Sequence, residues 1–447
     1  MTTPSTLAGF PFLELEFGPA GEALYPAQRD ALVAGCSQLG VTDLIFLAHG
    51  FRCDANDATE LYTSQLTTLR ANLARPEFAA ALSGRTFAVA GVYWPSQEYH
   101  ESSGVTLSQL RPTLCGGAEA LNHARSLLPA LPNSRSAQDQ FVSSVLSAFP
   151  NGQDDPTEGL PLLHKIGGFE LLNRLQPRLE GAIGEFLNLM SWTAMKSLSG
   201  AVGATGLAPI VSACQRELPT LKIHLVGHSL GGRLMASCAK ALSQLQARPI
   251  DSLSLLEAAF SHYGFSPDAG WGQRGFFREV VDAQIVNGPL ISTFSRRDVV
   301  VGTAYSVASR LAHDNLQSIG DASDPYGGIG HNGAQRTPES TTTPLHPAGQ
   351  CYDLQPGAIT CLDGSAGLIS GHGDVTNEHV TYAVASAISC CIRAEGRNLH
   401  NGAQRTPESA TIPCDLQPGA IACPDGFAPP RHVASAIQNG RRPQAES

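Results

Sequence analysis

The sequence is poor in charged side chains. They make up 15% of its 447 residues, against about a quarter in ordinary globular proteins. The formal net charge is -10, and no run of Lys and Arg occurs. Nucleic-acid binding needs clustered cations that neutralise phosphates. The composition therefore excludes nucleic acid as a partner.

Signals for export and membrane insertion are also missing. Residues 1–21 contain no basic segment, and Glu14 and Glu16 interrupt their apolar part. No segment reaches the roughly 18 uninterrupted apolar residues of a membrane span. We therefore expect a cytoplasmic protein without a membrane span, of an oligomeric state that the sequence leaves open.

No C-x-x-C motif is present, although the chain has 11 cysteines. Their number is odd, they are scattered, and Cys390 and Cys391 are adjacent, which favours free thiols in a cytoplasmic chain. The H-x-x-x-H spacing of His224 and His228 runs from an expected strand into a turn, whereas a helix is needed to bring such a pair onto one metal ion. We expect no metal and no cofactor.

Residues 221–242 are the most informative stretch. Residues 223–226 are mostly apolar and predict a buried strand. The sequence GHSLGG follows directly at 227–232, and apolar residues then recur at helical spacing. A strand, a G-x-S-x-G turn and a helix in succession predict a nucleophile elbow, which presents Ser229 at the start of the helix. Small residues are needed at positions 227 and 231, because the strand and the helix nearly collide there, and both positions are glycine.

Strand and helix patterns alternate along much of the chain. We expect strands at residues 12–17, 43–48, 87–94, 223–226, 253–259, 289–294 and 358–361, and helices at 27–39, 59–73, 195–218, 276–286, 303–311 and around 380–388. This order predicts an α/β domain over residues 1–389, with a mostly parallel sheet flanked by helices. Residues 12–17 are expected to form an edge strand.

The alternation is interrupted between residues 96 and 195. Helical patterns occur at 118–131, 141–149 and 160–175, and an insertion here would lie above the carboxyl ends of the strands. We interpret it as a large helical cap or lid. A disordered linker is the alternative, but the repeated Leu and Phe positions are more than a linker needs.

A serine nucleophile needs a histidine that takes its proton and a carboxylate that orients that histidine. In the chain order serine, acid, histidine, the candidates at expected strand ends are Ser229, Asp298 and His372. Glu257 remains the alternative acid, and His262 and His379 are the weaker alternatives for the base.

The GHSLGG motif, together with a strand 43–48 that ends in His49 and Gly50, resembles the lipases and esterases of the α/β-hydrolase superfamily. Residues from Met195 through the motif, and the NGAQ loop at 332–335, also resemble uncharacterised bacterial hydrolases. The resemblance covers residues 1–389. It implies a Ser229, Asp298 and His372 triad, with an oxyanion hole formed by the backbone N–H groups of Leu230 and Phe51.

From these features we expect a serine hydrolase that cleaves a carboxylic ester, with a small-molecule or acyl-ester substrate, through an acyl-enzyme intermediate. The same triad cleaves amides, so a peptidase or amidase is an alternative. A non-catalytic binding protein built on a hydrolase fold is a third hypothesis.

The end of the chain contains an internal duplication. HNGAQRTPES occurs at 331–340 and again at 400–409, and DLQPGAI begins at 353 and again at 415. The second copy lacks a counterpart of the loop that carries His372. We therefore expect residues 390–447 to be a poorly ordered tail that is dispensable for catalysis.

Overall fold

Nine strands form one sheet in the order β1-β2-β4-β3-β5-β6-β7-β9-β8. Every neighbouring pair is parallel except β1 and β2, which are antiparallel. The strands are β1 (Ser5–Leu7), β2 (Phe10–Glu16), β3 (Asp43–Ala48), β4 (Phe87–Tyr93), β5 (Lys222–His228), β6 (Ser252–Leu256), β7 (Leu290–Phe294), β8 (Ser340–Pro344) and β9 (Ile359–Asp363). The expected α/β architecture with a mostly parallel sheet is thus confirmed.

This computed structural model describes residues 5–96, 117–148, 163, 166–270, 272–302, 322, 324 and 326–390. All of them belong to one compact unit, residues 1–411. The expected helix at 303–311 and the second copy of the duplicated segment lie outside the described residues.

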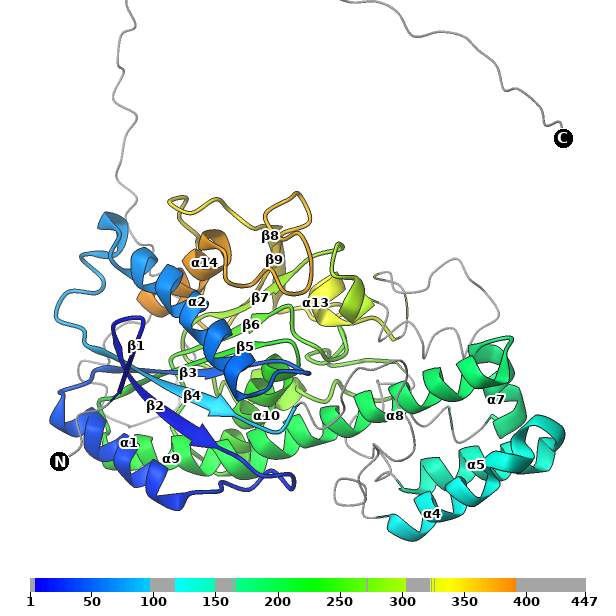
Figure 1. Cartoon of the computed structure of the whole chain (residues 1–447). Coiled ribbons are helices and arrows are strands. Elements are labelled where there is room, and N and C mark those ends of the chain that lie inside the picture. The colour runs from blue at the N-terminus through cyan, green and yellow to red at the C-terminus, as the bar shows by residue number, and fades with distance from the viewer. Residues whose placement is uncertain are drawn as a thin grey trace, which may run out of the picture. The chain divides into compact units, whose positions relative to one another are not determined.

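Helices cover both faces of the sheet (Figure 1). One face carries α2 (Ala55–Leu73) and α14 (Glu378–Ser389), and the other carries α1 (Pro26–Gln38), α9 (Ala208–Glu217) and α10 (Leu230–Gln244). Short helices are α11 (Arg278–Asp282), α13 (Ile329–Asn332) and the 3-10 turn η1 (Pro76–Phe78).

The strand β3 explains why both faces must be covered. All six of its residues are buried. Leu44 and Phe46 belong to the apolar cluster that includes α10, whereas Ile45 and Leu47 belong to the cluster that includes α2 and α14. Because successive side chains of a strand point to opposite faces, an apolar run without alternation requires helices on both sides.

A single helical run of 39 residues, Leu179–Glu217, links the sheet to the inserted segment. It consists of α8 (Leu179–Ala201), the π-helical turn η4 (Val202–Leu207) and α9. In Figure 1, α8 continues past the carboxyl ends of β2 and β4 toward α4 (Ala118–Leu127), α5 (Arg135–Ala148) and α7 (Gly168–Leu175). A 3-10 turn, η2 (Leu128–Asn133), joins α4 to α5.

Length and composition alone would allow this run to cross a membrane. It is the one such helix among the described residues, and 61% of its most apolar window is buried within the protein. Its contacts explain the burial, since α8 packs on α10 and on α7. The apolar character is therefore accounted for by packing inside the fold.

Two expectations need correction, one about this helix and one about the edge of the sheet. The helix predicted at 195–218 begins at Leu179, because the apolar pattern of α8 continues without interruption into the segment assigned to the insertion. A cap that ends at residue 195 would thus end in the middle of a helix. The strand predicted at residues 12–17 is present as β2 (Phe10–Glu16), but it is not an edge strand, because β1 pairs with it on its outer side.

Candidate active site

Ser229 sits in the sharp turn between β5 and α10, with φ 57° and ψ -124°. This backbone conformation is costly for a residue with a side chain. The turn is possible because glycines flank it. A Cβ atom at Gly227 would collide with the carbonyl group of Gly231, and one at Gly231 would collide with the carbonyl oxygens of Ala48 and His49. The sequence places glycine where strand and helix touch, as the elbow pattern predicts.

The structure brings Ser229, His372 and Asp298 together. Nε2 of His372 is 2.9 Å from Oγ of Ser229, and Nδ1 is 2.8 Å from Oδ2 of Asp298. A carboxylate only accepts hydrogen bonds, so Nδ1 carries the ring proton and Nε2 is left to accept from the Ser229 hydroxyl. This arrangement can withdraw a proton from the serine.

The three residues come from three different connections of the sheet. Ser229 follows β5, Asp298 follows β7, and His372 lies in the loop between β9 and α14. Asp298 is fully buried and its Oδ1 accepts from the N–H of Val301 at 2.9 Å. The side chain of His372 stays 16% exposed, so solvent or a ligand can reach the imidazole.

The two backbone donors expected for an oxyanion lie beside the serine. Leu230 is the first residue of α10, where the helix dipole favours negative charge, and Phe51 follows the end of β3. No described residue accepts a hydrogen bond from either N–H. Between them, a Cβ atom at Gly50 would lie only 2.8 Å from Cβ of Ser229. Gly50 therefore lets the two chain segments approach.

His49 holds the turn that carries Phe51. Its Nδ1 lies 3.0 Å from the carbonyl oxygen of Gly50, and its Nε2 accepts from the N–H of Trp94 at 3.4 Å. Its ring also stacks on Trp94 at a centroid distance of 5.6 Å. Burial lowers the pKa of His49 to about 4. A neutral imidazole thus fixes the backbone that carries the N–H group of Phe51.

His228, directly before the serine, contacts His372. Its Nε2 donates to the carbonyl oxygen of His372 at 2.8 Å, and the two rings lie 4.9 Å apart. Burial, and next the proximity of His372, lower the pKa of His228 to about 3. This contact joins the His228 ring to the backbone of His372, and no motif in the sequence indicates it.

Asp298 has a second carboxyl group as its neighbour. Glu257, the alternative acid from the sequence, has Oε2 at 3.9 Å from Nδ1 of His372, beyond hydrogen-bond distance. Burial, and next the charge of Asp298, raise the pKa of Glu257 to about 10. Asp298 is therefore the acid that holds His372. Glu257, Asp298 and His372 could together offer three ligand atoms to a metal ion, but the hydrogen bond from His372 to Asp298 already uses two of them.

The two weaker candidates for the base lie elsewhere. Nδ1 of His379, in the first turn of α14, accepts from the N–H of Ala348 at 3.1 Å. His262 is fully buried beside Asn332, 3.3 Å from its amide nitrogen. Neither is bonded to Ser229.

A second Ser–His–Asp arrangement occurs at the opposite ends of the strands. Nδ1 of His224 lies 2.8 Å from Oγ of Ser252, and Nε2 lies 2.9 Å from Oδ1 of Asp43. All three residues are fully buried, and Arg85 also pairs with Asp43. Burial raises the pKa of Asp43, but hydrogen bonds from His224 and Arg85 outweigh it and lower the pKa. No substrate can reach this cluster, so its role is structural.

The inserted segment reaches the candidate site through α8. Trp192 packs edge-on against Phe51 at a ring-centroid distance of 5.8 Å. Nε of Arg233 in α10 donates to the carbonyl oxygen of Lys196 in α8 at 3.1 Å. The helix that carries the insertion is thus fixed to both segments that supply the expected oxyanion donors.

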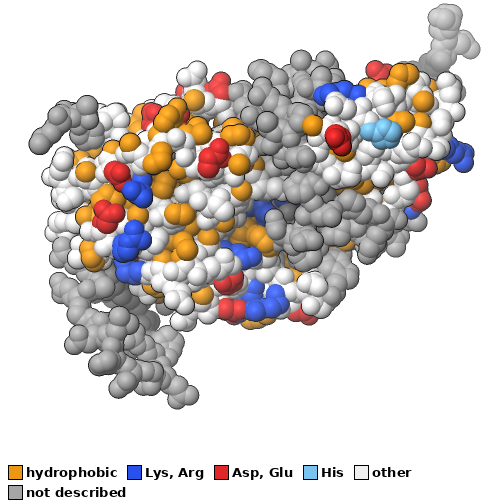
Figure 2. Space-filling view, turned by 90° about the horizontal axis from the view of Figure 1, so that it is seen from below, with side chains coloured by type: hydrophobic (Ala, Val, Ile, Leu, Met, Phe, Trp, Pro, Cys, Tyr) orange, Lys and Arg blue, Asp and Glu red, His pale blue; other side chains and the backbone are white. Residues whose placement is uncertain are grey.

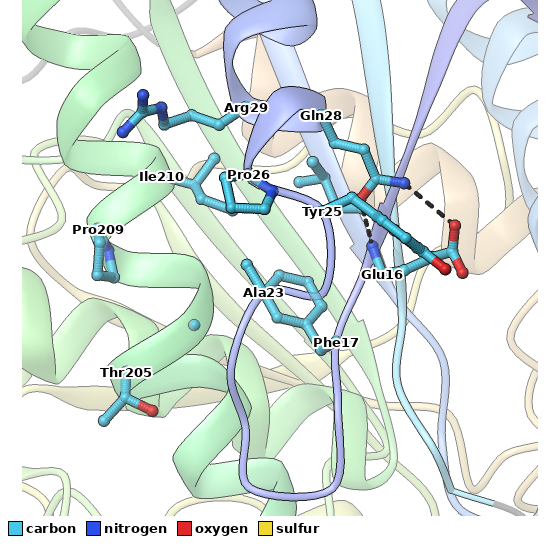
Figure 3. Close-up of a pocket in the computed structure, with 12 residues that line it drawn as sticks. Glu16, Phe17, Ala23, Tyr25, Pro26, Gln28, Arg29, Thr205, Pro209 and Ile210 are labelled. Atoms are coloured by element: carbon cyan, nitrogen blue, oxygen red, sulfur yellow. Dashed lines mark hydrogen bonds between the residues drawn. The ribbon is translucent and has the colours of Figure 1, made fainter.

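A separate surface cavity of about 180 Å³ lies between α1, η4 and the end of β2. Its wall includes Tyr25, Arg29 and Pro209, and Gln28 bridges to Glu16 through its amide (Figure 3). None of the three site residues lines it. On the face seen in Figure 2, described side chains of both charges are scattered among apolar ones.

Comparisons with models of known protein families, with curated proteins and with solved structures found no match to this chain.

Proposed function

We propose that this protein is a serine hydrolase of the α/β-hydrolase type, which cleaves a carboxylic ester through an acyl-enzyme intermediate. The observation that carries the proposal is the continuous chain of hydrogen bonds from Ser229 through His372 to Asp298, with distances of 2.9 and 2.8 Å. The strained elbow before a helix and the order of the three residues along the chain support it.

In this mechanism, Nε2 of His372 takes the proton of the Ser229 hydroxyl as the oxygen attacks the ester carbonyl. Asp298 keeps the imidazole oriented and stabilises its positive charge. The backbone N–H groups of Leu230 and Phe51 bind the tetrahedral oxyanion, each contributing about 3 kcal/mol. His372 then protonates the leaving alcohol and next activates the water that releases the acid.

The proposal can be tested with a fluorophosphonate probe, which labels an activated serine. We expect labelling of the wild type and none of Ser229→Ala. Ser252→Ala is the matched control, because Ser252 also contacts a histidine but lies in the inaccessible cluster. Equal labelling of wild type and Ser229→Ala would contradict the mechanism, and no labelling of either protein would favour a binding protein.

A substrate panel then distinguishes an esterase from a peptidase or amidase. We expect p-nitrophenyl esters to be hydrolysed faster than the matched p-nitroanilides. His372→Ala should lower kcat on the ester by about 10⁴-fold or more, with KM changed little. Faster turnover of the anilides would assign the protein to the amidases.

A further inference from the structure

Glu257 is the least favourably placed ionisable group beside the candidate site. It follows β6, it is fully buried, and neither carboxyl oxygen has a hydrogen-bond partner among the described residues. Its backbone has φ 44°, which lies in the left-handed region that most residues other than glycine and asparagine avoid. Strain and an unsatisfied buried carboxyl together cost stability.

Neighbouring segments hold the backbone of Glu257 in this conformation. Its N–H donates to the carbonyl oxygen of Thr293 at 3.2 Å. The next residues are bonded to the elbow, since the N–H of Ala259 donates to the carbonyl oxygen of Ser229 at 2.9 Å. On the other side Gly330 touches the Glu257 backbone so closely that a Cβ atom there would lie 2.5 Å from its carbonyl carbon. The position of Glu257 is therefore fixed relative to the serine.

The side chain points toward the imidazole that Asp298 holds. Oε2 of Glu257 is 3.9 Å from Nδ1 of His372, whereas Oδ2 of Asp298 is 2.8 Å from the same atom. Two carboxyl groups thus converge on one nitrogen from two adjacent strands. An approach of about 1 Å would bring Glu257 within hydrogen-bond distance.

We propose that Glu257 is a second positioning acid for His372, which holds the imidazole when Asp298 cannot. This inference rests on the proposed hydrolase function. With Asp298 ionised, Glu257 stays protonated, because burial, and next the repulsion from the Asp298 carboxylate, disfavours its charged form. When residue 298 carries no charge, this repulsion is removed, and Glu257 releases its proton to solvent as the pH rises. Its carboxylate then accepts the hydrogen bond from Nδ1 of His372.

A double-mutant comparison tests the proposal. We compare wild type, Asp298→Asn, Glu257→Gln and the double variant by kcat/KM on p-nitrophenyl acetate between about pH 6 and 9.5, with Ser229→Ala as the blank. We expect Asp298→Asn to retain at least about tenfold more kcat/KM than the double variant. This excess should grow with pH, because Glu257 must first ionise. Equal kcat/KM of the two variants at every pH would overturn the proposal.

Two further measurements separate the possible failures. Wild type that does not exceed Ser229→Ala would refute the proposed hydrolase function itself, independently of Glu257. The proton NMR signal of Nδ1–H of His372 needs no substrate. It should remain visible in Asp298→Asn and disappear in the double variant. If the double variant does not fold, Asp298→Asn alone still decides, since residual activity that does not rise with pH would exclude Glu257 as the second acid.

Discussion

Replacing Glu257 by Gln should make the free energy of unfolding of the protein fall less steeply as the pH rises. The pKa of Glu257 is about 10 in the folded protein, against an ordinary value of 4.5 in the unfolded chain. Between these values the folded protein keeps a proton that the unfolded chain has released. The stability associated with the protonated carboxyl is therefore fully present below about pH 4.5 and is lost as the pH rises toward 10.

The size of the effect follows from proton linkage. Each pH unit above 4.5 lowers the free energy of unfolding of the wild type by about 1.4 kcal/mol relative to a side chain that does not titrate. From pH 5 to pH 8 the loss is about 4 kcal/mol, and it is insensitive to the folded pKa because that pKa lies above the whole interval. The unpaired amide of Gln costs about 1–3 kcal/mol at every pH, so the slope is the diagnostic quantity.

Urea denaturation followed by tryptophan fluorescence at several pH values measures this slope. The difference between Glu257→Gln and wild type should shift by about 4 kcal/mol in favour of the variant between pH 5 and pH 8. Glu60→Gln, on the exposed side of α2, is the control for the substitution. A difference that stays constant with pH would show that Glu257 is ionised in the folded protein, and would refute the reasoning.

Three further predictions concern other parts of the fold. Asp43→Asn removes the charge that pairs with Arg85, so it should destabilise the protein by about 3–5 kcal/mol and leave kcat of the folded fraction unchanged. A fall in kcat as large as that of Asp298→Asn would contradict a structural role. Gly50→Ala should abolish labelling by fluorophosphonate because its Cβ would lie 2.8 Å from that of Ser229; normal labelling would show that the two segments can separate. A chain that ends near residue 393 should keep its kcat/KM, because β9 and α14 already complete the described fold; higher activity would indicate autoinhibition by the removed residues, and loss of folded protein would show that they belong to the core.

The sequence predicted the central strands well because their apolar runs are continuous. β3 has the bounds expected for it, and β5 begins and ends within two residues of the prediction. The strands at the edges were missed. β8 reads STTTP and carries no apolar pattern, since an edge strand needs less burial than a central one.

The candidate site was predictable only as far as motifs and chain order reach. The positions of three residues at the ends of expected strands allowed us to predict Ser229, Asp298 and His372 as site residues, and the structure places them in contact. The positioning contact of His228 with the backbone of His372 and the neutral state of Glu257 could not be derived, because no motif or chain order indicates them. The buried cluster of Asp43, His224 and Ser252 shows the converse problem, since the same residue types meet there without access to solvent.

The continuity of α8 into α9 has a mechanical consequence for the inserted helices. This helical run of 39 residues packs on α10 and contacts Phe51 through Trp192, and it continues through residue 195 without a break. The helices at its outer end cannot swing about that point without breaking backbone hydrogen bonds. A deletion of the inserted segment should therefore leave the whole helical run in place. A deletion that retains Leu179 onward keeps the contacts of α8 with α10, whereas one that extends to residue 195 also removes most of α8 (Leu179–Ala201).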